Sequence, residues 1–498
     1  MDGAYVQFEY AIKTAVFIAN RKNRNLHQLP QITFRLNMDG TLIGNKHIVA
    51  ISVNCVEGGP DCQSPKNLVP VGLFEFPKES YELYRKILPK SFLDSLGSVK
   101  YVRLNQKDIP VKIKLGGDFM NAVYVFGLAG VQSNFPCIFC TQHKNKLQQP
   151  NTTSYFDVQK EARTLEEQKL CLNKKGEKNC KGYKCEPLFG DLFEFSDYIM
   201  DTLHMKLRVY DVFMTDILHY ASKREKYGKE HDLQMEEKVA TLNEHAKILI
   251  GKRVFFAYDT KEQLIKLHGR FSGHLQELFF QKFPYDKLLD GKAEVDANKL
   301  VEDFREILDL LKVDPLKRKK NLKTVCIEFL QTFNAACLRS NVTPYLHIVG
   351  NHLFEFDERE NLGAFNMQEV EKGNDLLSRL YFSSTNVAKK PLYTMMQKLY
   401  RILEMQFSPD ERSDMQIFMN THVYDIEDDN FVVLPDMNRQ NDEQETDYEI
   451  ITSGSNNSSS DGEEEDETQS DQDLWFNLSN RKILTASRFS SFKRSKRL

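Results

Sequence analysis

The stretch QITFRLNMDGTLIGNKHIVAISVNC (residues 31–55) decides the fold class of this chain. Two runs with alternating apolar residues, QITFRLNM (31–38) and KHIVAISVNC (46–55), flank an Asp-Gly pair and predict two paired strands. A third strand is predicted near residues 68–76. The first strand ends at an acid, Asp39, so this strand pair also presents a candidate functional carboxylate.

A second pair of strands is predicted after a helix. The segment KESYELYRKILPKSFLDSL (78–96) has helical periodicity, and YVRLNQKDIPVKIKLGGD (101–118) predicts strand, turn and strand, ending at Asp118. The following FMNAVYVFGLAG (119–130) predicts a helix. Three strands, a helix, and then a further strand with an acid at its end is the element order of an RNase H-like fold, in the α+β class.

The middle of the chain is predicted to be mostly helical. Spacing close to 3.6 residues per turn recurs up to about residue 340, and it predicts a long helical insertion before the next conspicuous acid, Glu371. The clearest of these segments are DTLHMKLRVYDVFMTDILHY (201–220), EEKVATLNEHAKILI (236–250) and ANKLVEDFREILDLLK (297–312). Two further helices are predicted over LGAFNMQEVEKGNDLLSRLYF (362–382), which contains Glu371, and PLYTMMQKLYRILEMQF (391–407).

Composition predicts an intracellular protein with a large core. The chain has 498 residues, 41% of them hydrophobic, and this length allows about two or three domains. It contains no apolar run of about 18 residues, so we expect no membrane span. The N-terminus mixes charged and apolar residues and predicts an amphipathic helix rather than a signal peptide. Nine cysteines without a secretory signal fit a reducing compartment.

Charge is distributed unevenly along the chain. Residues 436–498 hold 14 acidic and 8 basic residues, whereas residues 1–435 hold 57 acidic and 59 basic residues. The acidic end is poor in apolar residues and is predicted to be disordered. Its last segment, RFSSFKRSKRL (488–498), is either a nuclear-import or DNA-contacting tail or a chance cluster. The run LKRKKNLK (316–323) is either a solvated helix end or a phosphate contact.

Three acids lie on the elements that metal-dependent phosphodiester chemistry requires. Asp39 and Asp118 end predicted strands, and Glu371 lies on a predicted helix. Carboxylate oxygens are the ligands that Mg²⁺ or Mn²⁺ prefers, and a bound ion pair can activate a water or a 3′-hydroxyl and stabilise the leaving oxygen. The chain has 71 acidic residues, so three acids alone prove little and their surroundings decide the case.

Two pairs of residues have the spacing of zinc ligands. Cys137 and Cys140 form C-x2-C in NFPCIFCTQH, and His347 and His352 form H-x4-H in PYLHIVGNHLF. Together they predict a structural zinc site of the Cys2His2 type. The alternative for the cysteine pair is two buried thiols, but the matching histidine pair favours zinc. Such a site would fasten the helical insertion to the core.

The remaining cysteines and one histidine leave alternatives open. Cys171, Cys180 and Cys185 in CLNKKGEKNCKGYKC either bind a second zinc with a fourth ligand or are incidental thiols of a solvated loop, the interpretation that we favour. His204 lies on an otherwise apolar helix and is flanked by two acids, Asp201 and Asp211. It is either a core histidine or a residue adjacent to the active site.

The order of these parts resembles the catalytic core of the Transib transposase and recombination-activating (V(D)J) recombinase superfamily. The resemblance covers roughly residues 31–385. Its segments, in chain order, are MDG (38–40), GGD (116–118), CIFC (137–140), DTLHMKLRVYDVF (201–213), YLHIVGNH (345–352) and EKGNDLLSR (371–379).

The resemblance implies an RNase H-like DDE transposase that nicks DNA and joins ends by direct transesterification. It places the catalytic, metal-binding acids on Asp39, Asp118 and Glu371, and a contact to the scissile region on His204. It places the zinc ligands on Cys137, Cys140, His347 and His352. It further implies Mg²⁺ or Mn²⁺ as cofactor, a homodimer, double-stranded DNA (transposon ends and target) as partner, no membrane, and a nuclear location.

One departure from the family leaves alternatives open. Only 38 residues precede Asp39, so the amino-terminal segments that bind DNA ends and form dimers in the family would be missing or very reduced. The chain would then be a catalytically inactive or truncated descendant that binds DNA or protein. A simple metal-dependent nuclease without strand transfer is a further alternative.

The predicted organisation has five regions. They are an N-terminal helix (1–30), the first part of the RNase H-like core (31–135), a zinc-fastened helical insertion (136–352), the catalytic helix and C-terminal helices of the core (353–436), and a disordered acidic tail with a basic end (437–498).

Overall fold

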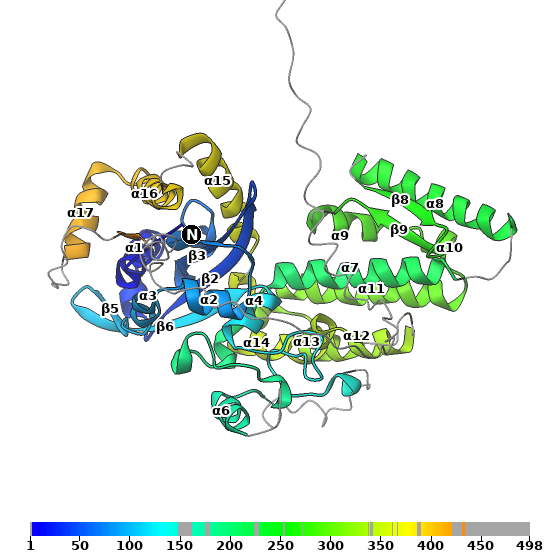
Figure 1. Ribbon diagram of the computed structural model, residues 1–498, viewed down its shortest axis with the longest axis horizontal. Helices are drawn as coiled ribbons and strands as arrows, with labels where there is room; N and C mark the ends of the chain where they lie inside the picture. The colour runs from blue at the N-terminus through cyan, green and yellow to red at the C-terminus, as the bar shows by residue number, and fades with distance from the viewer. Residues whose placement is uncertain are drawn as a thin grey trace, which may run out of the picture. The chain divides into compact units, whose positions relative to one another are not determined.

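An eight-stranded mixed sheet forms the centre of the fold (Figure 1), in a computed structural model. The strand order is β10-β1-β4-β3-β2-β6-β5, and β7 also pairs with β6. β2 pairs with β6 in parallel, β6 pairs with β7 in parallel, and the other pairs are antiparallel. The strands are β1 (Gly3–Val6), β2 (Ile32–Ile43), β3 (Lys46–Cys55), β4 (Val69–Phe76), β5 (Tyr101–Leu104), β6 (Lys107–Gly117), β7 (Tyr198–Met200) and β10 (Phe431–Val433).

The structure describes most of the chain up to residue 433. The described residues are 2–147, 162–174, 180–223, 229–251, 254–271, 273–336, 338, 342–360, 362–365, 367–385, 390–420 and 431–433. The predicted acidic tail (437–498) and its basic end lie outside them. The division into five regions stays a prediction, whereas the mixed α+β class is confirmed.

The predicted pairing of the first two strands is confirmed, but the first strand does not end at Asp39 as predicted. β2 continues through Asp39, which pairs with Ala50, and the strand ends only at Ile43. The chain reverses at Gly44, whose φ of +64° is a conformation that glycine adopts without a steric penalty. Asp39 therefore lies inside a strand rather than at its end, and the Asp-Gly pair is not the turn.

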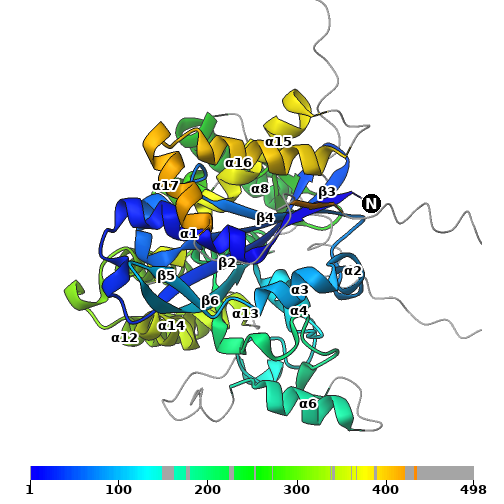
Figure 2. The ribbon, with the colours of Figure 1, turned by 90° about the vertical axis from the view of Figure 1, so that its left-hand side faces the viewer.

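β2 is buried on both faces, as a strand with a parallel neighbour usually is. Phe34 and Leu36 on one face and Arg35 and Asn37 on the other are all buried. Three helices contact this part of the sheet: α1 (Phe8–Lys22) contacts β3 and β4, α15 (Gln368–Ser384) contacts β2, and α16 (Pro391–Glu404) contacts β1 and β4 (Figure 2). α17 (Pro409–Asn420) packs against α1.

Two predictions near the N-terminus needed correction. The predicted N-terminal helix (1–30) contains α1, but β1 precedes it and pairs with β4 and β10. Four residues are too few for a periodic signal. The helix predicted over 78–96 is two helices, α2 (Tyr81–Ile87) and α3 (Lys90–Leu96), because Pro89 between them has no backbone N–H and restricts Leu88.

A mostly helical region follows β7, as predicted. Two of its long helices, α7 (Thr202–Ala221) and α11 (Lys292–Leu311), lie side by side (Figure 1). Their buried aromatic rings contact each other, as in Phe213 and Phe304, whose ring centroids lie 5.7 Å apart. The other elements are α8 (Lys229–Ile250), β8 (Phe255–Asp259), β9 (Leu264–His268), α9 (Gly273–Gln281), α10 (Tyr285–Leu288), α12 (Leu322–Ala336), α13 (Pro344–Asn351) and α14 (Leu353–Arg359). The β8–β9 hairpin was not predicted.

Two shorter helices precede this region, and a cysteine pair lies beside one of them. α4 (Phe119–Val125) follows β6, and α6 (Leu165–Asn173) carries Cys171. Cys171 is disulfide-bonded to Cys180, so these two are not the incidental thiols that we predicted. Cys185 is a free thiol. Sequence spacing alone does not reveal which cysteines pair.

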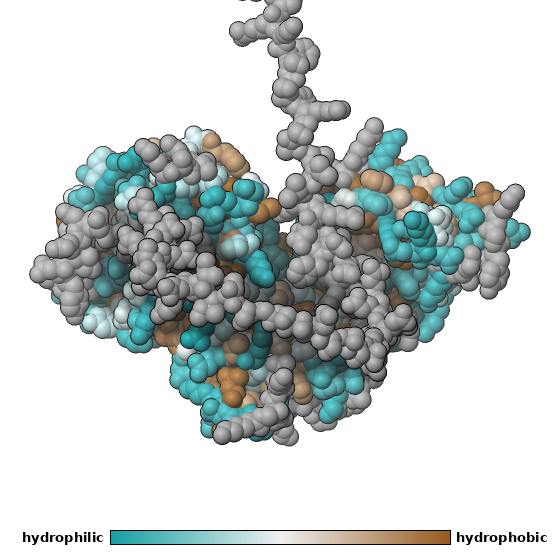
Figure 3. All heavy atoms as spheres, viewed as in Figure 1, coloured by the Kyte–Doolittle hydropathy of each residue, from teal (hydrophilic) through white to brown (hydrophobic). Residues whose placement is uncertain are grey.

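Apolar side chains fill the interior of the described part of the chain. The face drawn in Figure 3 presents mainly hydrophilic residues with apolar residues scattered among them. Among the described residues, no helix has both the length and the apolar character that crossing a bilayer would need.

Candidate functional site

Two of the predicted acids lie next to each other because β2 and β6 are parallel neighbours. Asn37 of β2 is opposite Gly116 of β6, and Asp39 and Asp118 each follow two residues later. Parallel neighbours lie about 4.8 Å apart, so the two carboxylates lie close together just beyond the point where the pairing of β2 with β6 ends. Asp118 ends β6 and caps α4, where its carboxylate accepts a hydrogen bond of 2.7 Å from the Asn121 backbone N–H.

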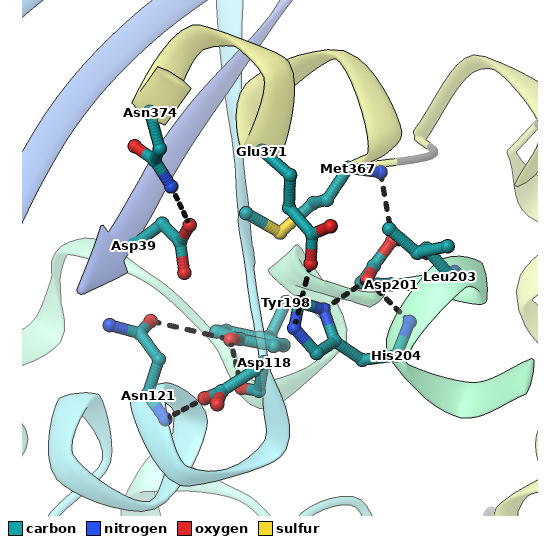
Figure 4. Close-up of polar contacts among 10 residues, drawn as sticks. All are labelled: Asp39, Asp118, Asn121, Tyr198, Asp201, Leu203, His204, Met367, Glu371 and Asn374. Carbon is teal, nitrogen blue, oxygen red and sulfur yellow. Dashed lines mark hydrogen bonds and ion pairs between the residues drawn. The ribbon is translucent and has the colours of Figure 1, made fainter. Parts of the chain in front are cut away.

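The third acid comes from α15, which crosses β2. Glu371 lies in the first turn of this helix, and Asn374 follows one turn later on the same face. The Asn374 amide donates a hydrogen bond of 2.6 Å to Asp39 Oδ2, which ties α15 to β2. Figure 4 shows the side chains of Asp39, Asp118 and Glu371 pointing into a common space from three elements. The structure thus brings together the three acids that the sequence singled out.

His204 lies in the same space and connects the acids to the helical region. Its Nε2 lies 3.4 Å from Glu371 Oε1, and its Nδ1 lies 2.5 Å from Asp201 Oδ2 (Figure 4). Asp201 is fully buried at the end of β7 and caps α7. His204 is therefore adjacent to the candidate active site, and the alternative of a simple core histidine does not apply.

Burial raises the pKa values of Asp39 and Asp118, and His204 lowers both. Burial, together with Asp118 and Glu371, raises the pKa of Asp39 to about 7, while His204 and Asn374 act in the opposite direction. Burial also raises the pKa of Asp118. Burial would lower the pKa of His204, but Asp201, Asp118 and Asp39 raise it to about 9. One imidazolium faces several carboxylates, so the space favours an additional cation.

The three acids do not form a compact set for a single ion. Among the described residues, the ligand atoms of the four cysteines and histidines Cys137, Cys140, His347 and His352 lie close enough together to bind one ion, whereas the oxygens of the three acids do not. The donor set, carboxylate oxygens, suits Mg²⁺ or Mn²⁺.

The predicted zinc ligands form a closed, buried group. The ligand atoms of Cys137, Cys140, His347 and His352 all lie within 4.8 Å of one another. His352 Nε2 lies 3.5 Å from Cys137 Sγ and 3.1 Å from His347 Nε2, and Cys140 Sγ lies 3.3 Å from His347 Nε2. Tetrahedral zinc implies S···N separations of about 3.6 Å and N···N separations of about 3.3 Å. The group therefore fits a structural zinc ion.

Neighbouring groups hold these ligands in place. His347 lies on α13, which packs against α7, and His352 caps the same helix. The Glu355 carboxylate lies 3.7 Å from His352 Nδ1, in the place where zinc-bound histidines usually meet a carboxylate. The Arg163 guanidinium donates a hydrogen bond of 2.9 Å to the Cys137 carbonyl. The Cys2His2 group thus joins the loop after α4 to the end of α13, two segments that both belong to the predicted insertion, and the fastening of that insertion to the core stays a prediction.

Sequence reasoning missed a second carboxylate–imidazole pair beside the acids. Glu79, in the loop before α2, lies 3.0 Å from His47 Nε2, and its other oxygen accepts a hydrogen bond of 3.1 Å from the Tyr84 hydroxyl. A Cβ atom on Gly40 would collide with Glu79, so this carboxylate lies directly over the residue after Asp39. Its charge contributes to the raised pKa of Asp118. No spacing in the sequence links Glu79 to the acids.

In comparisons with known proteins, no family model matches the chain and no curated protein matches it.

Proposed function

We propose that this chain is a DDE-type DNA transposase or recombinase that uses two Mg²⁺ or Mn²⁺ ions to cleave DNA strands and transfer their ends. The observation that carries the proposal is the convergence of Asp39, Asp118 and Glu371 from two parallel strands and one helix. Three carboxylates and a histidine in one partly enclosed space form a donor set of the kind that phosphodiester chemistry requires.

The arrangement of strands supports an RNase H-like core. β4, β3 and β2 form an antiparallel meander, and β6 and β7 continue the sheet in parallel with β2. The first acid lies on the first strand of the meander and the second at the end of β6, which is the order expected for this fold. The resemblance of six sequence segments to the Transib and V(D)J recombinase superfamily supports the same proposal.

Each side chain has a proposed role. When bound, the divalent ions would supply Lewis-acid activation of the attacking oxygen and stabilise the leaving oxygen. Asp39 and Asp118 would hold both ions and Glu371 one of them, while Asn374 orients the Asp39 carboxylate. His204 Nε2 is placed to donate a hydrogen bond to a phosphate oxygen beside Glu371. The buried Cys2His2 group would hold a structural zinc ion.

Double-stranded DNA is the proposed partner. The basic run 316–323 leads into the first turn of α12 and borders a cavity of about 560 Å³ that is also lined by Arg359. Arg318 is held by a buried ion pair with Asp357, whereas Lys319 and Lys323 are exposed. Exposed lysines on a fixed segment suit contacts to phosphates. A nuclear location and a homodimer that handles two DNA ends belong to the same proposal.

The test is DNA cleavage by the purified, zinc-loaded chain with Mn²⁺. Supercoiled plasmid reports nicking without knowledge of a recognition sequence, and an oligonucleotide end reports joining. Asp118→Asn and Glu371→Gln should abolish both activities. Their controls are Asp108→Asn, an exposed acid of the same strand, and Glu369→Gln, a neighbour on the same helix; both should retain activity.

Three outcomes would decide between the proposals. Nicking by Asp118→Asn or Glu371→Gln at the wild-type rate would overturn the assignment of these acids. Nicking without joining would favour a simple nuclease. A wild-type chain that binds DNA but cleaves none would favour an inactive descendant.

A further inference from the structure

We propose that Asp201 is a positioning residue that couples the helical region to the catalytic helix and holds Glu371 in the metal site without touching the metal. The inference rests on the proposed function, because Glu371 is taken as a metal ligand. It assigns a role to a carboxylate that sequence reasoning saw only as a neighbour of His204.

The Asp201 carboxylate makes more contacts than a helix cap needs. It is fully buried, and it accepts hydrogen bonds from the backbone N–H groups of Leu203 and His204 at 3.1 and 2.8 Å, as an ordinary cap of α7 does. It also accepts hydrogen bonds from His204 Nδ1 at 2.5 Å and from the Met367 backbone N–H at 2.8 Å. The bond to His204 Nδ1 fixes a side chain of α7 itself, and the bond to Met367 leaves α7 for a distant segment.

Both extra contacts lead to Glu371. Met367 caps α15, and its carbonyl accepts a hydrogen bond of 3.0 Å from the Glu371 N–H, so the bond from Met367 to Asp201 fixes the turn that carries Glu371. The bond to His204 Nδ1 orients the imidazole so that its Nε2 faces Glu371 Oε1 at 3.4 Å. Asp201 therefore acts on Glu371 through the backbone and through a side chain (Figure 4).

A buried arginine supports the charge of Asp201. Arg35 of β2 is 1% exposed, and its Nε and Nη2 have no hydrogen-bond partner among the described residues. It lies over the Phe365 ring at 5.6 Å, and it interacts electrostatically with Asp201. An interior cation with unfilled donors stabilises a nearby carboxylate, so Asp201 is favoured as an anion at the junction of β7, α7 and α15.

The test is Mn²⁺ affinity of the zinc-loaded protein, measured by electron paramagnetic resonance. Asp201→Asn keeps an oxygen for Met367 but replaces the acceptor that faces His204. Removing a group that holds a metal ligand in place typically lowers metal affinity by about 10- to 100-fold, and we expect the Mn²⁺ affinity of Asp201→Asn to fall within this range. The control Asp211→Asn, on the same helix but bonded to Gln276, should stay within about twofold of wild type.

A second readout separates positioning from general loss of structure. The circular dichroism spectrum and the urea midpoint of Asp201→Asn should match those of wild type, so that the loss of Mn²⁺ affinity reports on the position of Glu371 and not on unfolding. If Asp201→Asn fails to fold, His204→Gln removes one of the two routes and leaves the Asp201 carboxylate and its bond to Met367 in place, and it should still weaken Mn²⁺ binding.

The outcomes distinguish the inference from the proposed function. Mn²⁺ binding in wild type that Asp118→Asn abolishes but Asp201→Asn leaves unchanged would overturn the inference and leave the function standing. Unchanged Mn²⁺ affinity in His204→Gln, where Asp201→Asn does not fold, would also overturn it. Absence of Mn²⁺ binding in wild type would overturn the proposed function itself.

Discussion

Replacing Asp39 by asparagine should stabilise the metal-free protein while it removes activity. Burial and the neighbouring acids raise the pKa of Asp39 from 3.8 to about 7 in the folded chain. Because the folded-state pKa lies above the unfolded one, ionisation of Asp39 lowers the free energy of unfolding as the pH rises from about 4 to about 7. This decrease in the free energy of unfolding is complete above about pH 7 and absent below about pH 4.

The size of the effect follows from these two pKa values. One pKa unit corresponds to about 1.4 kcal/mol, so the full difference of about three gives a ceiling of about 4 kcal/mol. Asp39 is only partly covered, and relaxation around it reduces the cost, so we expect a gain of about 2 kcal/mol at pH 8. At pH 5 the gain should fall below about 1 kcal/mol, because the folded-state carboxyl is then mostly protonated.

Urea unfolding at both pH values measures this gain in zinc-loaded protein without added Mg²⁺ or Mn²⁺. Asp108→Asn, an exposed acid of β6, is the control and should change stability by less than about 0.5 kcal/mol at either pH. Saturating Mn²⁺ should reverse the order, because it stabilises wild type and not Asp39→Asn. If the metal-free wild type were more stable than Asp39→Asn at pH 8, the ionised Asp39 carboxylate would not destabilise the fold, and the reasoning from its burial and its acidic neighbours would be refuted.

Two further predictions concern the zinc group and the basic run. Cys140→Ser should lower the zinc content measured by mass spectrometry from about one ion per chain to near zero and lower the melting temperature, whereas Cys185→Ser should keep the zinc. Equal zinc in both variants would contradict the site. The double change Lys319→Ala with Lys323→Ala should reduce the slope of log affinity for duplex DNA against log salt by about 2, while Lys261→Ala on the β8–β9 turn should leave it unchanged. An unaltered slope in the double variant would remove this segment from the DNA-binding surface.

Local patterns in the sequence were sufficient for the main parts of the fold. Alternating apolar residues predicted β2 and β3, and C-x2-C with H-x4-H predicted a metal group that the fold assembles across more than 200 residues. Asp39, Asp118 and Glu371 were recognisable because each lies on or beside a periodic element. Such signals depend on nearest neighbours in the chain, which a single sequence contains.

Contacts between distant segments could not be predicted in the same way. Asn374 bonds to Asp39 across 335 residues, and Asp201 bonds to Met367 across 166 residues. Neither pair has a spacing that a motif could encode, since the contacts arise only when α15 packs on β2 and β7 joins β6. β1 was missed because four residues carry no period, and the end of β2 was placed too early because the apolar alternation stops at Asp39 while the pairing with β3 continues.

The most direct measurement is anomalous X-ray diffraction from crystals of the zinc-loaded protein grown with Mn²⁺. We expect two manganese peaks about 3.5–4 Å apart, bound by carboxylate oxygens of Asp39, Asp118 and Glu371, and a separate zinc peak in the Cys2His2 group. Manganese held elsewhere on the chain, with these three acids free of metal at saturating Mn²⁺, would contradict this expectation.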